Sequence, residues 1–101
     1  MVVKTKGKTA MVLMEADGDK RFFCQDGQVS KNLKELIDCL NRMTEEAFRH
    51  HVTSEKNDFS NWIRDVLGDV TLASDLGSAS SPAEAGRIVA ERINRLQKRY
   101  M

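Results

Sequence analysis

The sequence predicts an α+β fold in which a short N-terminal antiparallel β-meander packs on a bundle of four to five helices. Asp26-Gly27 lies between two short apolar runs, and it signals a hairpin because Gly accepts the positive φ of a type I′ turn. From Leu33 onward, apolar residues recur every three to four positions, which is the period of an amphipathic helix. The length of 101 residues fits one small domain.

Three short strands are expected ahead of the helices. Residues 9–15 are rich in apolar side chains, and residues 21–24 and 28–30 flank the Asp26-Gly27 turn. Apolar runs this short suit strands better than helices. Residues 1–8 carry three Lys and no acid, and we expect them to form a flexible basic arm.

Capping residues mark the expected helix starts, because their side chains accept hydrogen bonds from otherwise unpaired backbone N–H groups. The expected caps are, in chain order, Asn32, Thr44, Asn57 or Ser54, Asp69 and Ser81. Gly68 is expected to end the third helix. We expect one globular unit over residues 9–76, a flexible Ser-rich linker over residues 77–81, and a C-terminal amphipathic helix over residues 82–101.

The clearest apolar stripe lies on the third helix, where side chains at helical spacing form one face. Together with apolar positions on the first two helices, this stripe defines the candidate core. The expected core residues are Leu36, Phe48, Phe59, Trp62, Ile63 and Val66.

A candidate polar surface lies opposite Trp62. It consists of His51, Asp58, Asn61 and Asp65. This surface is either solvated or in contact with a partner. For His51 the alternatives are a partly buried ring bonded to a carbonyl or an acid, a pH-sensitive contact, and a metal ligand. Adjacent His50 and His51 point about 100° apart on a helix, so we expect no metal site.

Charge and cysteine usage limit the remaining classes. A net charge of +1 argues against bulk attraction to nucleic acid or membranes. Cys24 and Cys39 have no CxxC or Cys/His spacing, and we expect two free, buried thiols. No apolar run approaches the roughly 18 residues of a membrane span, and no signal-peptide pattern is present. We therefore expect a cytoplasmic location.

Three runs between Phe22 and Ala73 form a recognisable pattern: His51-Val52, Lys56-Asn57-Asp58-Phe59, and Trp62-Ile63-Arg64-Asp65-Val66-Leu67-Gly68-Asp69. The pattern resembles an uncharacterised prokaryotic domain family with no assigned function. The likeness covers about half the chain, and the basic arm and the last helix fall outside it. The resemblance implies a small module that occurs alone or attached to unrelated domains, with no catalytic residues to carry over.

No catalytic signature is present in the sequence. Neither the nucleophile motif G-x-S-x-G nor a Gly-rich phosphate loop occurs. We therefore expect a non-enzymatic protein-interaction or regulatory module that uses no cofactor.

The last helix is the candidate partner surface. Its apolar stripe packs either on the chain's own helices or on a partner, which is another protein or a second copy in a homodimer. The candidate contacts are Ile88, Arg92, Ile93, Arg95, Leu96 and Arg99. The alternative function is a nucleic-acid-binding protein that uses the same helix and the basic residues Lys4, Lys6 and Lys8.

Overall fold

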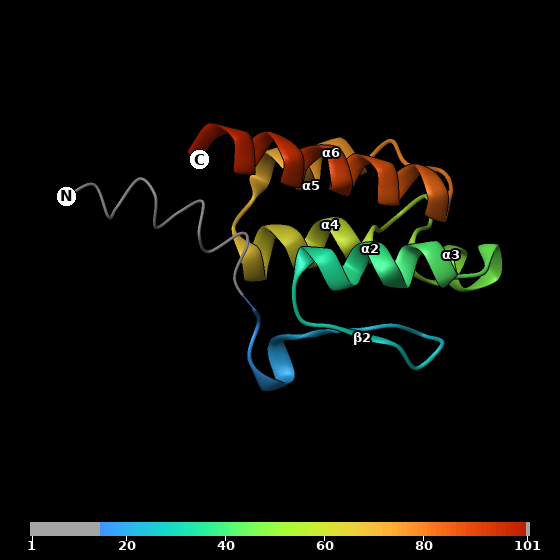
Figure 1. The fold of residues 1–101 in the computed structure, drawn as a ribbon. Helices are drawn as coiled ribbons and strands as arrows, with labels where there is room; N and C mark the ends of the chain where they lie inside the picture. Colours follow the sequence, from blue (N-terminus) through green and yellow to red (C-terminus); the bar gives the residue numbers. More distant parts are fainter. Residues whose placement is uncertain (1–14, 101) are drawn as a thin grey trace.

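The computed structural model describes the backbone of residues 15–100 and the side chains as far as Gln97. A two-stranded antiparallel hairpin, β1 (Phe22–Phe23) and β2 (Val29–Ser30), follows a short 3₁₀ turn, η1 (Gly18–Lys20). Helix α2 packs on β2 and on the last helix, and Figure 1 shows it lying between them. The predicted α+β class is confirmed.

The remaining elements follow in chain order. They are α2 (Leu33–Arg42), α3 (Glu45–His51), α4 (Asp58–Trp62), η2 (Ile63–Leu67), α5 (Val70–Leu76) and α6 (Pro82–Tyr100). Of the three predicted strands, the second and third form the hairpin. Residues 9–14 of the first lie outside the described residues, and Glu15 is not part of a strand. None of the helices described is both long and apolar enough to cross a membrane.

Side-chain caps begin the helices where the sequence predicted. Asn32 accepts the N–H of Glu35 at 2.8 Å, and the Glu35 carboxylate accepts the N–H of Lys31 at 3.0 Å. Four further helices start in the same way, with caps at Thr44, Asn57, Asp69 and Ser81. Local chemistry therefore fixes where the helices begin.

The third predicted helix is not a regular α-helix throughout. Helix α4 continues into η2, which is π-helical, and Gly68 ends it at φ +78°. A π turn is wider than an α turn, so each following side chain is rotated less. Leu67 thereby lies on the buried side with Ile63, whereas Val66 is only half-buried against the core.

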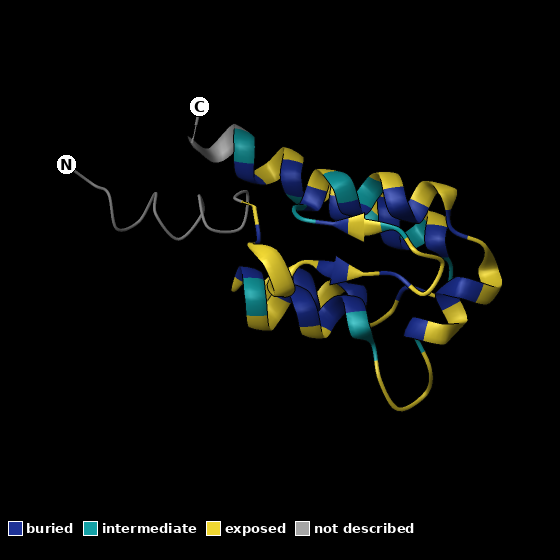
Figure 2. Cartoon of the chain, turned by 90° about the horizontal axis from the view of Figure 1, so that it is seen from below, coloured by how far each residue is buried: buried dark blue, intermediate teal, exposed yellow. Residues whose placement is uncertain are grey.

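Aromatic rings occupy the centre of the core. Phe22 stacks on Phe59 with ring centroids 4.9 Å apart, and Phe48 stacks on Phe59 at 5.7 Å. Trp62 meets Phe22 edge-on at 5.7 Å, and its indole N–H donates to the Lys20 carbonyl at 2.7 Å. The hairpin is thus fixed to α3 and α4. Buried residues, dark blue in Figure 2, line the facing sides of the helices. All the predicted core residues except Val66 are among the buried ones: Leu36, Phe48, Phe59, Trp62 and Ile63.

Helix α6 belongs to the same core, which is the first of the two arrangements expected for its apolar stripe. Its buried side chains are Ala85, Val89, Ile93 and Leu96. An added Cβ at Gly86 would lie 3.3 Å from Asn41 Oδ1 and 3.7 Å from Leu40 Cβ, so the absent side chain lets α6 approach α2 closely. In the connection over residues 77–81, Ala79 is buried and its N–H donates to the Leu76 carbonyl.

Candidate functional site

His51, at the end of α3, forms hydrogen bonds through both ring nitrogens. Nδ1 lies 2.9 Å from Asp58 Oδ2, and Nε2 accepts the backbone N–H of Gln25 at 2.9 Å. Because Gln25 supplies the proton of the second bond, the neutral ring carries its own proton on Nδ1 and donates it to Asp58. His51 is 5% exposed and tilts against the rings of Phe22 and Phe59.

Asp58 receives a second donor from Lys56, whose Nζ lies 3.0 Å from the same carboxylate oxygen. Burial acts to raise the pKa of Asp58, but hydrogen bonds from His51 and Lys56 outweigh it and lower that pKa below its usual value. The network ties the first residue of α4 to the end of α3 and to the hairpin.

The polar atoms of His51 are therefore used within the fold. Neither ring nitrogen is left to bind a metal ion or to take a proton from a substrate, and the ring is buried. Of the alternatives for His51, a buried ring bonded to an acid is the one that the structure shows, since Nδ1 bonds to Asp58. The ring therefore does not belong to the candidate polar surface. Its role is to join elements that are distant in sequence.

The other members of the candidate polar surface separate into two places. Asp58 pairs with His51, whereas Asn61 and Asp65 are exposed. Arg64 joins these two, donating to Asn61 Oδ1 at 3.1 Å and to Asp65 Oδ1 at 3.0 Å. The four predicted residues do not form one site.

The apolar residues named as candidate partner contacts on α6 pack within the chain. Ile93 and Leu96 are buried against the chain's own core, and Ile88 is half-buried against it. As far as Gln97, the apolar stripe of α6 is therefore covered by the chain's own helices.

The predicted arginine contacts on α6 face partners within the chain. Arg92 donates to Asp69 through Nε at 2.8 Å and through Nη2 at 3.1 Å. Arg95 lies 3.8 Å from Asp75. The side chain of Arg99 lies outside the described part of the chain. Helix α6 is therefore held to α5 by charged as well as apolar contacts.

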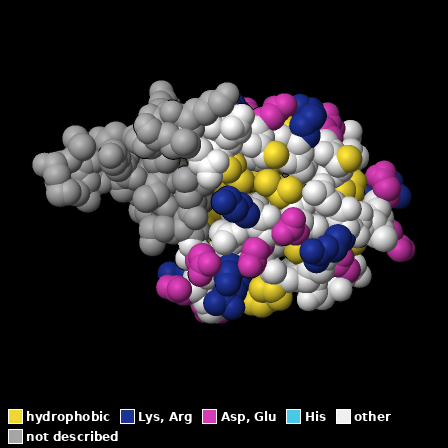
Figure 3. Space-filling view, viewed as in Figure 1, with side chains coloured by type: hydrophobic (Ala, Val, Ile, Leu, Met, Phe, Trp, Pro, Cys, Tyr) yellow, Lys and Arg dark blue, Asp and Glu magenta, His cyan; other side chains and the backbone are white. Residues whose placement is uncertain are grey.

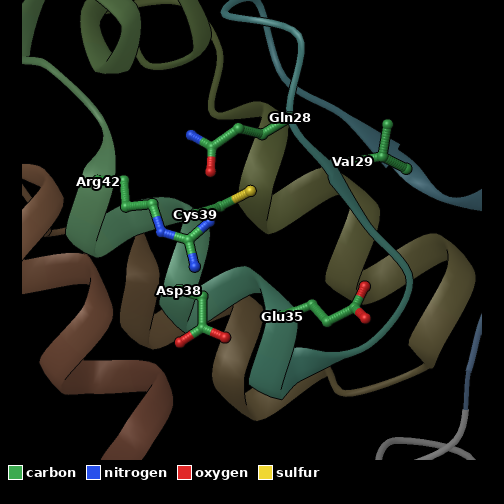
Figure 4. Close-up of a pocket in the computed structure, with 6 residues that line it drawn as sticks. All are labelled: Gln28, Val29, Glu35, Asp38, Cys39 and Arg42. Carbon is green, nitrogen blue, oxygen red and sulfur yellow. The ribbon is translucent and has the colours of Figure 1, made fainter.

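A surface cavity of ≈ 330 Å³ lies between the hairpin and α2. Its lining residues are Gln28 and Val29 from the hairpin and Glu35, Asp38, Cys39 and Arg42 from α2. Figure 4 shows this arrangement, with side chains of both charges on the helical wall. A second cavity of ≈ 360 Å³, where α6 begins beside the end of α2, has one ionisable side chain, Glu45. The first cavity therefore offers more varied chemistry.

One backbone edge of β2 is turned toward the first cavity. Cys24 N–H donates to the Gln28 carbonyl at 2.8 Å, so these two residues form a hydrogen-bonded pair of the antiparallel ladder. Such pairs alternate with pairs whose N–H and C=O groups point away from each other. Phe23 and Val29 form the next pair. Val29 therefore presents its N–H and C=O on the outer edge of β2, beside the cavity that it lines.

The same edge binds backbone at one position already. Lys31 follows Val29 by two residues, so its carbonyl points to the same side. That carbonyl accepts the N–H of Ala16 at 2.6 Å. Ala16 thus bonds to the edge at the end nearest α2, so a backbone N–H group reaches this edge at one position.

A pair of thiols lies beneath the cavity. Cys24 and Cys39 are both free and buried, as predicted, and their sulfurs are 3.6 Å apart. Ser30 Oγ donates to the Cys39 sulfur at 3.1 Å. Burial is the main cause that raises the pKa of Cys24, and the neighbouring Cys39 adds to it.

Comparison of the chain with protein-family models, with curated proteins and with solved structures gives no match. Within residues 15–100, no group of three or more His, Cys, Asp and Glu side chains is placed to hold a metal ion.

Sequence reasoning missed the cavity because its walls come from two elements. The hairpin signal at Asp26-Gly27 and the helical period after Leu33 were both visible. Nothing in either pattern indicates that the outer edge of β2 faces α2. The contact of Cys24 with Cys39 likewise depends on how the hairpin packs on the helix.

Proposed function

We propose that this chain is a non-enzymatic protein-interaction module that binds an extended segment of a partner along the outer edge of β2. The outward N–H and C=O of Val29, beside the cavity, carry the proposal. Peptides that add to a sheet edge bind through main-chain hydrogen bonds, and neighbouring pockets give selectivity.

An apolar pair beside this edge supports the proposal. Phe23 is 58% exposed and Val29 is 45% exposed, and as cross-strand neighbours they share the outer face of the hairpin. In Figure 3 apolar side chains interrupt the charged surface at the bottom of the view, where Figure 1 places the hairpin. Such a pair offers contact area to an apolar side chain of an added strand.

Helix α2, which forms the other wall of the cavity, provides polar contacts for the partner segment. Asp38 and Arg42 are exposed and line the cavity, and Glu35 lies one turn before Cys39 on the same helix. Successive side chains of a strand point to opposite faces. The partner segment therefore alternates apolar residues, which face Phe23 and Val29, with polar residues, which face α2.

A non-enzymatic role is supported by the contacts of a buried histidine and a buried aspartate, both of which bond to other residues of the chain. His51 has both ring nitrogens bonded, and Asp69 is buried against Arg92. Neither group faces the first cavity.

The test is selection of peptides from a displayed library of random extended sequences on the immobilised full chain, followed by calorimetry on synthetic peptides. The decisive variant is Val29→Pro, which removes the outward N–H. Since that N–H takes no part in the ladder with β1, the hairpin bonds remain. One lost hydrogen bond of about 1–1.5 kcal/mol corresponds to roughly tenfold weaker binding.

The matched control is Val29→Thr, which keeps the N–H and a β-branched side chain. We expect it to bind within about threefold of the natural chain, since the main-chain bonds are intact. If no selected peptide binds, or if the Pro and Thr variants bind equally well, strand addition at this edge is wrong. Circular dichroism of both variants verifies that each is folded.

Nucleic-acid binding stays a prediction that the described side chains do not favour. Arg87 pairs with Glu91, and Arg92 and Arg95 pair with acids of α5 and of its cap. Lys4, Lys6 and Lys8 lie outside the described residues. A gel-shift assay with DNA and RNA at low salt decides it, since phosphate contacts are strongest there.

A further inference from the structure

We propose that Cys24 and Cys39 form a redox-reactive pair, which closes to an intramolecular disulfide when a small peroxide enters the cavity at Cys39. This inference is independent of the binding of a partner segment. It concerns two buried thiols to which nothing above assigns a role.

The two sulfurs are already in contact. They lie 3.6 Å apart, one directly after β1 and the other in α2, and both side chains are buried. A disulfide bond is about 2.05 Å long, so the sulfurs need to close by roughly 1.5 Å. Rotation of the two side chains supplies a movement of this size, because the elements that carry them already pack together.

The cavity gives the two thiols different roles. Cys39 lines it and Cys24 does not. Gln28, Asp38 and Arg42 make the approach polar, which suits a small hydrogen-bonding oxidant such as hydrogen peroxide. Cys39 is therefore the sulfur that an oxidant in this cavity meets, and the Cys24 sulfur lies 3.6 Å from it without lining the cavity.

The hydrogen bonds of the two sulfurs are consistent with Cys39 reacting first and Cys24 second. The Cys39 sulfur accepts bonds from the Ser30 hydroxyl and the Cys24 thiol. Both donors can stay in place when Cys39 gives up its proton. Burial raises the pKa of Cys24, so this thiol keeps its proton until the second step.

The reaction balances with one peroxide. The Cys39 thiolate attacks a peroxide oxygen, an S–O bond forms as the O–O bond breaks, and the leaving hydroxide takes up the proton that Cys39 released, giving water. The Cys24 sulfur then attacks the Cys39 sulfenic acid. An S–S bond forms, the S–O bond breaks, and hydroxide leaves with the Cys24 proton as a second water. The two sulfurs lose two electrons in total, which the peroxide gains.

The disulfide would tie the end of β1 to α2 beside the cavity. Closing a loop of this length stabilises a fold chiefly by restricting the unfolded chain. We therefore expect oxidation to raise the Tm by on the order of 10 °C.

The experiment treats the reduced full chain with hydrogen peroxide and stops the reaction with catalase. Because both thiols are buried in the folded chain, the chain is then unfolded in guanidinium chloride, and remaining thiols are labelled with N-ethylmaleimide before mass spectrometry. The oxidised chain should be monomeric, unlabelled and lighter by two hydrogens. In Cys24→Ser, Cys39 should be trapped as a sulfenic acid by dimedone. In Cys39→Ser, Cys24 should still take the maleimide label.

Three results would overturn the proposal. The first is a natural chain that keeps both thiols at a dose which fully oxidises glutathione in parallel. The second is disulfide-linked dimers in place of the internal bond. The third is oxidation of Cys24 in Cys39→Ser as fast as in the natural chain. The Tm of the oxidised natural chain gives a readout that needs no variant.

Discussion

Replacing His51 by Ala is expected to destabilise the fold by about 4 kcal/mol. Removing the ring leaves a void beside the stacked rings of Phe22 and Phe59, and large-to-small core changes of this kind cost on the order of 2–3 kcal/mol for a ring smaller than Phe. The change also leaves the N–H of Gln25 without its acceptor, which costs about 1–3 kcal/mol where water cannot replace it. Both terms follow from the two ring contacts and the 2.9 Å bond to Gln25.

Urea unfolding followed by Trp62 fluorescence measures this loss, because Trp62 is the only Trp and lies in the same core. The matched control is His50→Ala, since His50 is the exposed neighbour and its loss should change stability by no more than about 0.5 kcal/mol. His51→Phe keeps a ring and removes only the polar contacts, so it should cost about 2 kcal/mol. If His51→Ala is no more destabilising than His50→Ala, the structural role assigned to His51 is refuted.

Three further predictions concern other contacts of the fold. The pKa of Asp58 is lower in the folded chain, so the carboxylate stabilises the fold above its ordinary unfolded pKa of about 3.9, and this effect is lost as pH falls through the lowered folded pKa. The difference in unfolding free energy between the natural chain and Asp58→Asn should therefore shrink over that pH range. A difference that stays constant with pH would contradict this prediction. Arg92→Met leaves Asp69, which is 3% exposed, as a buried carboxylate without its cation. The unfolding free energy measured in urea should fall by about 3–5 kcal/mol. A fall of less than about 1 kcal/mol would show that the Arg92–Asp69 pair is unimportant for stability. Gly86→Leu should lower the unfolding free energy by about 2–3 kcal/mol, because the side chain displaces α6 from α2. Gly86→Ala should stay within about 1 kcal/mol of the natural chain, because better helix propensity offsets the close contact. Equal melting temperatures for the two variants would argue against close packing of α6 on α2.

Features set by neighbouring residues could be predicted from the sequence. The Asn32 cap with Glu35 and the left-handed Gly68 each depend on chemistry within a few positions. Gly27, at φ +94°, marked the hairpin correctly, but the predicted type I′ turn at Asp26-Gly27 is wrong. The Cys24 N–H bonds to the Gln28 carbonyl, so the loop has three residues, 25–27, and Asp26 does not have the positive φ of a type I′ turn. Helical periodicity likewise located Phe59 and Trp62 in the core. The fold class follows from these local signals because each indicates the same element order.

Features set by packing could not be predicted in this way. The bond between His51 and Gln25 joins residues 26 positions apart, and no local pattern distinguishes a bonded buried His from an exposed one. The π-helical stretch that leaves Val66 only half-buried against the core cannot be detected by a search for a regular helical period. Sequence reasoning also left open which surface the apolar stripe of α6 covers.

The candidate binding edge combines both kinds of feature. The hairpin itself was predictable, but the direction of the Val29 backbone depends on the register that pairs Phe23 with Val29. A shift of one residue would turn the Val29 N–H toward β1 and close the edge. The proposed function therefore rests on a register that only the structure supplies.

Amide hydrogen exchange at Val29, measured by NMR with and without the tightest selected peptide, tests strand addition most directly. We expect the Val29 amide to exchange rapidly in the free chain and to become protected when the peptide is bound, because its N–H then donates to the added strand. An unprotected Val29 amide in the saturated complex, with spectral changes confined to α6, would contradict binding at the β2 edge.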